Sequence, residues 1–397
     1  MNKNDFKYVS EEAKLSNEQI RPGLTYWKDA WRRLKKNVLA MIGLVVIILI
    51  TLFGVLGPFF SPYKDSTQVV GFVNIPPRIS ITKAGDTFFY FNGTQYTLFT
   101  VTEKGMLLEK LDEIRSLRDT VNNKFYFDLD GEQVILDYSY KVREELAFEG
   151  INFSITYQGV EYKQPYKTVA NQMFLWGSDA LGRDVLTRVM YGARISLFIA
   201  LIAALVNLFI GVLYGSISGL EGGTVDNVMM RIIDVINSIP LLLYVILIMV
   251  ILNDNSMFTV MLTLGLVYWV GMARLVRGQV LGLKNQEFVL AARALGVPKR
   301  QIIFRHLIPN ALGPIVVSLT MMIPSAIFTE AFLSFIGLGA SAPQASWGSL
   351  ANDAVEVFRS SFYQLVFPAS AIAITILAFN FFGDGLRSAL DPKLRKG

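Results

Sequence analysis

The sequence lacks cysteine entirely and contains a single histidine, His306, among its 397 residues. Without thiols, the chain has no disulfides, thiolate metal sites, iron–sulfur clusters or cysteine nucleophiles. One histidine excludes multi-histidine metal sites and argues against a histidine-based catalytic triad. Charged residues are also scarce, at 17% against about a quarter in soluble domains, while 52% of the residues are hydrophobic. This composition argues against a wholly soluble protein and rules out a disordered chain.

The apolar residues gather in six long runs, each close to the roughly 20 residues that a helix needs to cross a bilayer. The runs cover residues 38–60, 196–217, 232–252, 257–273, 312–336 and 363–382. The first run is too long, too bulky and too far from the N-terminus for a cleavable signal peptide. We therefore expect six transmembrane helices, the first of which is retained.

Basic residues flank these runs unevenly, and their placement predicts the orientation of the chain. They cluster in three segments: before the first run, between the fourth and fifth runs, and after the sixth. With six spans these segments share one side, so we expect both termini in the cytoplasm. Arg183, Arg188 and Arg194 fall on the other side, where they pair with Asp179 and Asp184 or lie against the headgroups.

Two further segments flank the first run. Residues 24–34 carry Trp27 and Trp31 beside basic residues, which predicts an interfacial amphipathic helix. After the run, residues 61–190 alternate polar with apolar residues around three glycine-containing turns, a pattern typical of β-hairpins. Residues 103–117 instead have helical spacing. We expect a small β-rich α+β domain outside the cell, which serves as a spacer, as a docking surface or in substrate binding.

The stretch from residue 287 to residue 310 reads EFVLAARALGVPKRQIIFRHLIPN. Asn285 suits a helix start, Gly296 a helix end and Pro298 the start of a second helix. The pattern predicts helix, sharp turn and helix outside the membrane. Its first helix places Phe288, Ala291, Ala292 and Leu295 on one side, which suits binding in a partner's groove. A loop that packs on its own protein would show the same amphipathic pattern.

The spacing of Ala291-Ala292, Gly296 and Pro309 resembles the EAA loop of ABC-transporter importer permeases, the coupling element that docks on the ATPase subunit. Leu290 stands where that family has glutamate, and Glu287 lies one turn earlier. Other stretches resemble the C-type permeases of the oligopeptide/dipeptide/nickel branch (OppC/DppC-like): residues 176–184, 191–196, 333–339, 347–348, 383–387 and 390–392. The resemblance runs from about residue 174 to 393 and includes the first span. The long insert is similar to that of oligopeptide permeases from Gram-positive bacteria.

The resemblance implies an all-α polytopic membrane protein with six transmembrane helices and an extracellular β-rich α+β insert. It implies five segments: 1–37, a cytoplasmic segment with an interfacial helix; 38–60, the first span; 61–190, the insert and pre-helix segment; 191–386, a five-helix core with a coupling loop at 278–310; and 387–397, a cytoplasmic tail. It also implies peptide transport across the cell membrane, with oligopeptides as substrate; dipeptides, nickel or opines are the alternatives.

The implied partners are a B-type permease subunit, two ABC ATPase subunits, an extracellular peptide-binding protein and the peptide itself, with no nucleic acid. The chain has no G-x-x-x-x-G-K-[ST] phosphate loop, so ATP and Mg would be bound by the partner ATPases and the chain itself would not be an enzyme. The alternative from a different functional class is a membrane sensor with an extracellular ligand domain. The spacing of the coupling loop speaks against it, and no convergent cluster supports a membrane enzyme.

The resemblance assigns ATPase coupling to Glu287, Phe288, Ala291, Ala292, Arg293, Leu295, Gly296, Val297, Pro298, Arg305, His306 and Pro309. For the translocation path we expect the fifth run, which prolines interrupt, with Met321, Met322, Ser325, Thr329 and Glu330. Glu330 either contacts the passing peptide or lies near the headgroups or an arginine. Asp234 has the same two alternatives, of which a local ion pair with Arg231 is simpler. No catalytic residue and no metal site is expected.

Overall fold

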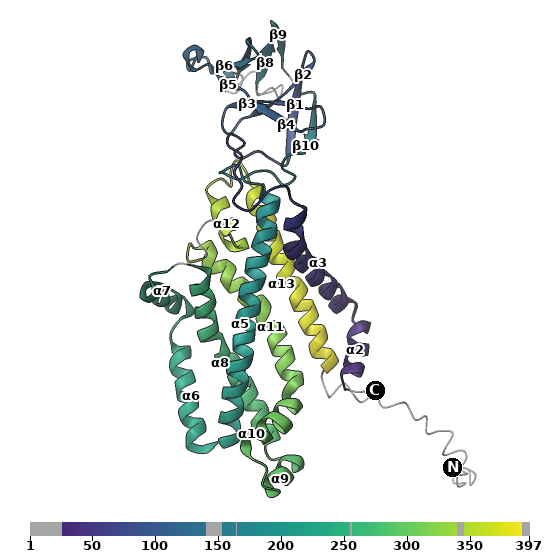
Figure 1. Cartoon of the computed structure of the whole chain (residues 1–397), viewed down its shortest axis with the longest axis vertical. Coiled ribbons are helices and arrows are strands. Elements are labelled where there is room, and N and C mark those ends of the chain that lie inside the picture. Colours follow the sequence, from purple (N-terminus) through teal and green to yellow (C-terminus); the bar gives the residue numbers. More distant parts are fainter. Residues whose placement is uncertain (1–25, 140–152, 164, 255, 340–344, 391–397) are drawn as a thin grey trace, which may run out of the picture.

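The computed structural model describes residues 26–139, 153–163, 165–254, 256–339 and 345–390. A bundle of helices carries a domain of β-strands at one end, while α9 and α10 lie at the opposite end (Figure 1). The helices are α2 (Tyr26–Lys36), α3 (Val38–Phe60), α5 (Val185–Glu221), α6 (Gly223–Ser238), α7 (Leu241–Leu252), α8 (Met257–Leu283), α9 (Glu287–Ala294), α10 (Lys299–Gln301), α11 (Ile308–Phe335), α12 (Trp347–Val355) and α13 (Tyr363–Leu390).

Among the described residues, five helical stretches are long and apolar enough to cross a membrane: α3, α5, α8, the continuous stretch Lys299–Phe335 and α13. The predicted run at 232–252 is not one straight helix, because α6 and α7 meet at an angle of 84°. The break lies at Ile239, whose backbone is extended (φ −93°, ψ 125°), directly before Pro240. Proline disfavours helical backbone in the residue before it, which explains the bend.

The predicted boundaries shift at both ends of the core. α5 begins at Val185, inside the range 61–190 that we assigned to the insert and pre-helix segment. α13 continues to Leu390, past residue 386. Asp391 and Pro392, which complete the C-terminal motif, lie outside the described residues.

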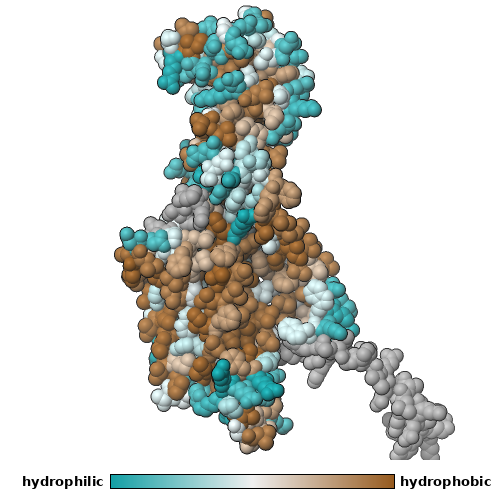
Figure 2. All heavy atoms as spheres, in the orientation of Figure 1, coloured by the Kyte–Doolittle hydropathy of each residue, from teal (hydrophilic) through white to brown (hydrophobic). Residues whose placement is uncertain are grey.

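The bundle is held together by close packing between α5 and α8. A Cβ atom on Gly215 of α5 would lie 2.3 Å from the carbonyl oxygen of Ala273 on α8, so only glycine allows the two backbones to approach this closely. The face of the bundle shown in Figure 2 is predominantly apolar, and only 17% of the most apolar window of α3 is buried inside the chain. Such a surface is suited to lipid or to a partner subunit.

The strand domain consists of two five-stranded antiparallel sheets with the orders β10-β1-β2-β3-β4 and β5-β6-β7-β8-β9. The strands are β1 (Arg78–Ala84), β2 (Thr87–Asn92), β3 (Thr97–Val101), β4 (Leu107–Lys110), β5 (Asp112–Glu113), β6 (Lys124–Leu129), β7 (Glu132–Asp137), β8 (Ser154–Tyr157), β9 (Val160–Tyr162) and β10 (Lys167–Ala170). The predicted hairpins are found as β2–β3, β6–β7 and β8–β9. Phe89 and Phe91 of the first sheet pack with Phe127 and Ile155 of the second in one core.

The prediction of a helix at residues 103–117 is wrong. Gly105 has a positive φ of 92°, which turns the chain between β3 and β4, and Leu107 then pairs with Val101 across this hairpin. Leu107 of β4 and Leu111, between β4 and β5, are buried, whereas Met106 is 47% exposed. The helical spacing of apolar residues therefore arises by coincidence within a hairpin, and the domain contains only a short 3₁₀ turn in this segment.

The strand domain is fixed to the bundle at its base. The Tyr363 hydroxyl at the start of α13 lies 3.0 Å from the carbonyl oxygen of Ile75 and 2.7 Å from that of Ser178. The Gln364 amide donates to the Asn74 side chain at 2.8 Å. These buried bonds join three distant segments, so the orientation of the domain over the helices is specified.

Candidate functional site

The α8–α11 loop, defined here as residues 284–307, forms the predicted helix–turn–helix at the end of the bundle opposite the strands (Figure 1). The first helix, α9, begins after Gln286, whose extended backbone is its N-cap, one residue beyond the predicted Asn285. The chain then reverses at Gly296, where φ is +74°. Because Cβ-bearing residues rarely adopt this left-handed conformation, the glycine sets the angle of the turn. Pro298 precedes α10, as expected from the sequence.

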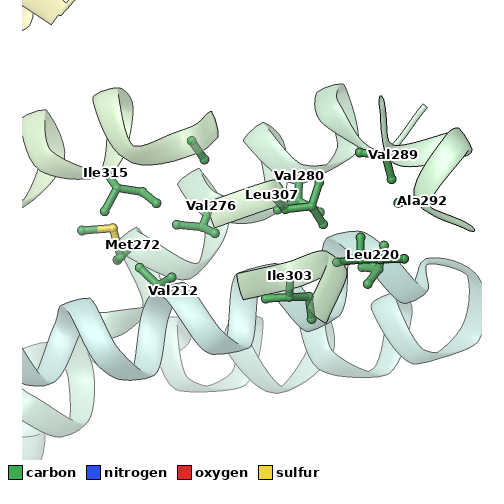
Figure 3. Close-up of a cluster of buried hydrophobic side chains, with 12 residues drawn as sticks. Val212, Leu220, Met272, Val276, Val280, Val289, Ala292, Ile303, Leu307 and Ile315 are labelled. Carbon is green, nitrogen blue, oxygen red and sulfur yellow. The ribbon is translucent and has the colours of Figure 1, made fainter. Parts of the chain in front are cut away.

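One side of α9 is anchored in the bundle. Val289 is fully buried and Ala292 is 6% exposed. Both join an apolar cluster (Figure 3) whose other buried members are Val212, Leu220, Met272, Val276, Val280, Ile302, Ile303, Leu307, Ala311 and Ile315. This cluster draws on α5, α8, α9 and α11 together, so α9 is attached to the spans and is not a free surface loop.

The other side of α9 is exposed and apolar. Phe288 is 39% exposed, Leu295 is 83% exposed, and Ala291 between them is also exposed. Their spacing of three and four residues places them on one helical face. The prediction that Ala292 shares this face is wrong, because Ala292 packs against its own chain. The amphipathic pattern therefore reflects both packing on the protein's own chain and an outward apolar face. Val289 and Ala292 point inward. The residues on the outward face are Phe288, Ala291 and Leu295.

The remaining residues assigned to coupling lie along the loop, except Pro309, which is the second residue of α11. Glu287, Arg293, Gly296, Pro298, Arg305 and Pro309 are exposed, whereas Val297 and His306 are partly buried. The loop therefore exposes basic residues as well as an apolar face.

An ion pair and a hydrogen bond hold the base of the loop to the C-terminal end of α5. Lys299 lies 2.6 Å from Glu221, and Lys284 donates to the Gly219 carbonyl at 3.0 Å. Earlier on α8, Arg277 donates two bonds of 2.6 Å to Asp226, which also accepts from the Ser218 hydroxyl. These contacts connect the loop and the end of α8 to α5 and α6.

A π-helical segment, Ile302–Leu307, joins α10 to α11 and was not predicted from the sequence. It contains both Arg305 and His306. Such wide turns occur within helices and are frequent at functional sites. No residue type marks a π-helix, so the only available signal was the apolar spacing, with Ile302, Ile303 and Leu307 all buried.

Of the residues assigned to the translocation path, Met321, Ser325 and Thr329 follow one another at intervals of four residues and share one side of α11. Ser325 is exposed and Met321 is 36% exposed, whereas Met322 and Thr329 are partly buried. The Thr329 hydroxyl is hydrogen-bonded to that of Tyr268 on α8. Glu330 is fully buried within the chain and faces no open surface in this conformation.

Glu330 is instead surrounded by serine hydroxyl groups. Ser196 of α5 donates to one of its carboxylate oxygens at 2.9 Å and Ser334 to the other at 2.8 Å. Ser346, the N-cap of α12, is a third partner. Among the described residues, no arginine pairs with Glu330, in contrast to one of the alternatives considered from the sequence. The three serines join α5, α11 and α12 around a single carboxylate, and we call this group the Glu330 cluster.

Two other predictions about charged residues are confirmed in part. Asp179 pairs with Arg183 at 2.7 Å and with Arg188 at 2.8 Å. Asp184 takes a different role and caps α5 by accepting from the Thr187 amide. Arg194 donates to the carbonyl oxygen of Gly54.

Asp234 forms the local ion pair that the sequence suggested. It lies 4.0 Å from Arg231, and a second arginine, Arg274 of α8, lies closer at 3.0 Å. Within the described ranges no group of three or more histidine, cysteine, aspartate or glutamate side chains is arranged to hold a metal ion.

Comparison with known families gives two matches. Residues 211–396 match the model described as "Binding-protein-dependent transport system inner membrane component". Residues 25–77 match the "N-terminal TM domain of oligopeptide transport permease C".

Curated relatives extend these matches over nearly the whole chain. The dipeptide transport system permease protein DppC of Bacillus subtilis (strain 168) is 38% identical over 98% of this chain and 93% of its own length. The oligopeptide transport system permease protein OppC of the same strain is 37% identical over 99% of this chain and 98% of its own length. OppC of Escherichia coli (strain K12) is 47% identical, but over 55% of this chain and 72% of its own. Among solved structures, a chain of the inward-facing MetNI methionine ABC transporter is 19% identical, covers 51% of this chain and 96% of its own, and has a TM-score of 0.42.

Proposed function

Since this chain belongs to the oligopeptide and dipeptide transport permeases of binding-protein-dependent transport systems, we propose that it is the C-type permease subunit of an ATP-driven ABC importer of oligopeptides. The observation that carries the proposal is the exposed apolar face of α9, formed by Phe288, Ala291 and Leu295 on a firmly anchored loop. Its position suits attachment to a separate ATPase subunit. The chain itself is a non-catalytic part of the transporter and needs no cofactor of its own.

The proposed topology has six crossings, with α6 and α7 together forming one broken span. Both termini and the α8–α11 loop lie in the cytoplasm, and the strand domain lies outside the cell. Two observations support this arrangement: the loop and α2 lie at one end of the bundle with the strands at the other (Figure 1), and the loop is rich in lysine and arginine. A peptide-binding protein would deliver substrate on the side of the strand domain.

The proposed assembly pairs this chain with a B-type permease subunit, so that the substrate path runs between the two. Two ABC ATPase subunits bind ATP and Mg and dock on the coupling loops. Closure of the ATPase pair moves α9, and the shared apolar cluster carries the movement into α5, α8 and α11. Alternating tilts of these helices expose the path first outward and then inward.

Oligopeptides are the proposed substrate, with dipeptides, nickel and opines as alternatives within the same mechanism. The relatives named for dipeptide and for oligopeptide transport have almost the same identity to this chain, so identity alone does not choose between them. The long insert does not choose between them either, because both Bacillus relatives match over nearly the whole chain. The match of residues 25–77 to the N-terminal TM domain of oligopeptide transport permease C supports oligopeptides.

The function is tested by reconstituting the chain with its B-type permease, ATPases and binding protein in proteoliposomes. We expect uptake of a labelled oligopeptide that requires ATP and the binding protein. A dipeptide and nickel ion are offered in parallel as competing substrates. Uptake of the dipeptide or of nickel in preference to longer peptides would replace the substrate proposal, and uptake without ATP would overturn the importer mechanism.

A further inference from the structure

The short helix α2 has two distinct sides. Ala30 and Leu34 are 6% and 3% exposed, and Leu34 packs with Ala40 and with Ala389 at the end of α13. On the outward side Trp27 is 51% exposed and Trp31 is 45% exposed. The inner side thus docks the helix on the bundle, and the outer side presents two large amphipathic rings.

The same helix is strongly basic. It carries five lysine and arginine residues against one acidic residue, a net charge of +4 over 11 residues. Asp29 accepts from Arg33 at 2.6 Å and from Arg32 at 3.0 Å. Although burial acts to raise the pKa of Asp29, the two arginines hold it below its ordinary value, so Asp29 stays ionised at neutral pH. Lys28, Lys35 and Lys36 are exposed.

The position of α2 relative to the first span is fixed. Only Asn37 separates it from α3, and the Asn37 side chain accepts from the Ala40 amide at 3.1 Å. The 23 residues of α3 correspond to about 34 Å of helix, close to the thickness of the hydrocarbon layer. On α13, a Cβ atom at Gly385 would lie 2.1 Å from that of Ala40, so the junction is closely packed. α2 therefore lies where the hydrocarbon meets the headgroups.

We propose that the outward side of α2 is a binding surface for anionic phospholipid headgroups. Trp27 and Trp31 lie at the boundary between acyl chains and headgroups, where indole rings are favoured. Lys28, Lys35 and Lys36 face the lipid phosphates, and clustered basic residues beside a span attract anionic lipid. The proposal rests on the proposed function only in placing α3 across a bilayer. The net charge of +4 on α2 complements anionic headgroups, which favours anionic lipid as the occupant.

The test uses the assembled transporter in nanodiscs made with brominated phosphatidylglycerol or brominated phosphatidylcholine, which quench nearby tryptophan. The contribution of α2 is the part of the quenching that disappears in the Trp27→Phe/Trp31→Phe variant. We expect phosphatidylglycerol to quench this part more strongly than phosphatidylcholine, and the difference to shrink as salt is raised.

The charge variant is Lys28→Gln/Lys35→Gln/Lys36→Gln, and its matched control removes three exposed lysines from the strand domain, Lys83→Gln/Lys104→Gln/Lys110→Gln. We expect the charge variant to lose the preference for phosphatidylglycerol by about tenfold or more, and the control to keep it. Equal quenching by both lipids in the unmodified complex would overturn the proposal, as would a preference that survives in the charge variant. Quenching requires no transport, so a failure here is distinct from a failure of peptide uptake.

Discussion

At the scale of single residues, Gly296 is the position where the loop has least freedom to change. Its φ of +74° is left-handed, although no atom lies within 4 Å of the place where a Cβ would be. A substitution there is limited by backbone strain of about 1–2 kcal/mol and not by lack of space. We predict that Gly296→Val alters the turn and uncouples ATP hydrolysis from peptide uptake in proteoliposomes.

Gly282→Ala is the matched control, since Gly282 also has open space but an ordinary helical backbone. It should leave uptake per ATP unchanged. Undiminished uptake per ATP in Gly296→Val would contradict a role for this turn in coupling.

Leu295 is the most exposed apolar residue on the outward face of α9, at 83%. Burial of a leucine contributes about 1.5–3 kcal/mol, which corresponds to roughly ten- to more than a hundredfold in affinity. We predict that Leu295→Asp weakens co-purification of the ATPase subunits by at least tenfold. Val121→Asp in the strand domain, where Val121 is 88% exposed, is the comparison and should retain the ATPases. Retention by both variants would show that α9 does not bind them.

At the scale of elements, the Glu330 cluster joins α5, α11 and α12. Replacing Glu330 with alanine leaves the Ser196 and Ser334 hydroxyls without their acceptor, which costs about 1–3 kcal/mol per buried group. We predict a lower thermal unfolding temperature for Glu330→Ala and a smaller decrease for Glu330→Gln, whose amide oxygen still accepts. Glu356→Ala, an exposed change beside α12, should have no effect. An unfolding temperature unaltered in Glu330→Ala would mean that the cluster does not secure α12.

Most helices and hairpins could be predicted from the sequence, because the length of an apolar run and the residues of a turn are local signals. The run at 38–60 matches α3 at both ends, and Asn92, Asp130 and Gln158 begin the turns between the predicted hairpins. What was missed depends on contacts between distant residues. At residues 103–117 the apolar spacing predicted a helix, but the chain forms paired strands on either side of Gly105. Similarly, the surroundings of Glu330 come from serines on three elements, which no spacing rule brings together.

The site was predictable to the same limited degree. Periodicity placed Phe288, Ala291 and Leu295 on one face, and this is observed. It could not tell which alanine of the pair turns inward, since both suit a close backbone approach. The π-helix at 302–307 and the ion pair between Lys299 and Glu221 arise from packing against α5 and were not visible in the sequence.

At the scale of the whole molecule, the proposed topology places the two ends of the long axis on opposite sides of the membrane (Figure 1). The natural absence of cysteine makes single introduced cysteines unambiguous reporters. We predict that a membrane-impermeant maleimide labels Val121→Cys in intact cells and labels Gln301→Cys only after permeabilisation. Both positions are exposed, so accessibility within the chain is matched. The reverse pattern would invert the topology and remove the basis for ATPase docking at α9.

The most direct measurement of the whole account is cross-linking from a single cysteine at Leu295 in the assembled transporter. If α9 is held in a groove of an ATPase subunit, Leu295→Cys should cross-link to that subunit in high yield, and Val121→Cys should not. Adding ATP should change the yield at Leu295→Cys, because the docked helix moves with the ATPase pair. Cross-links from Leu295→Cys only to lipid or to the other permease, with none to an ATPase, would contradict the account.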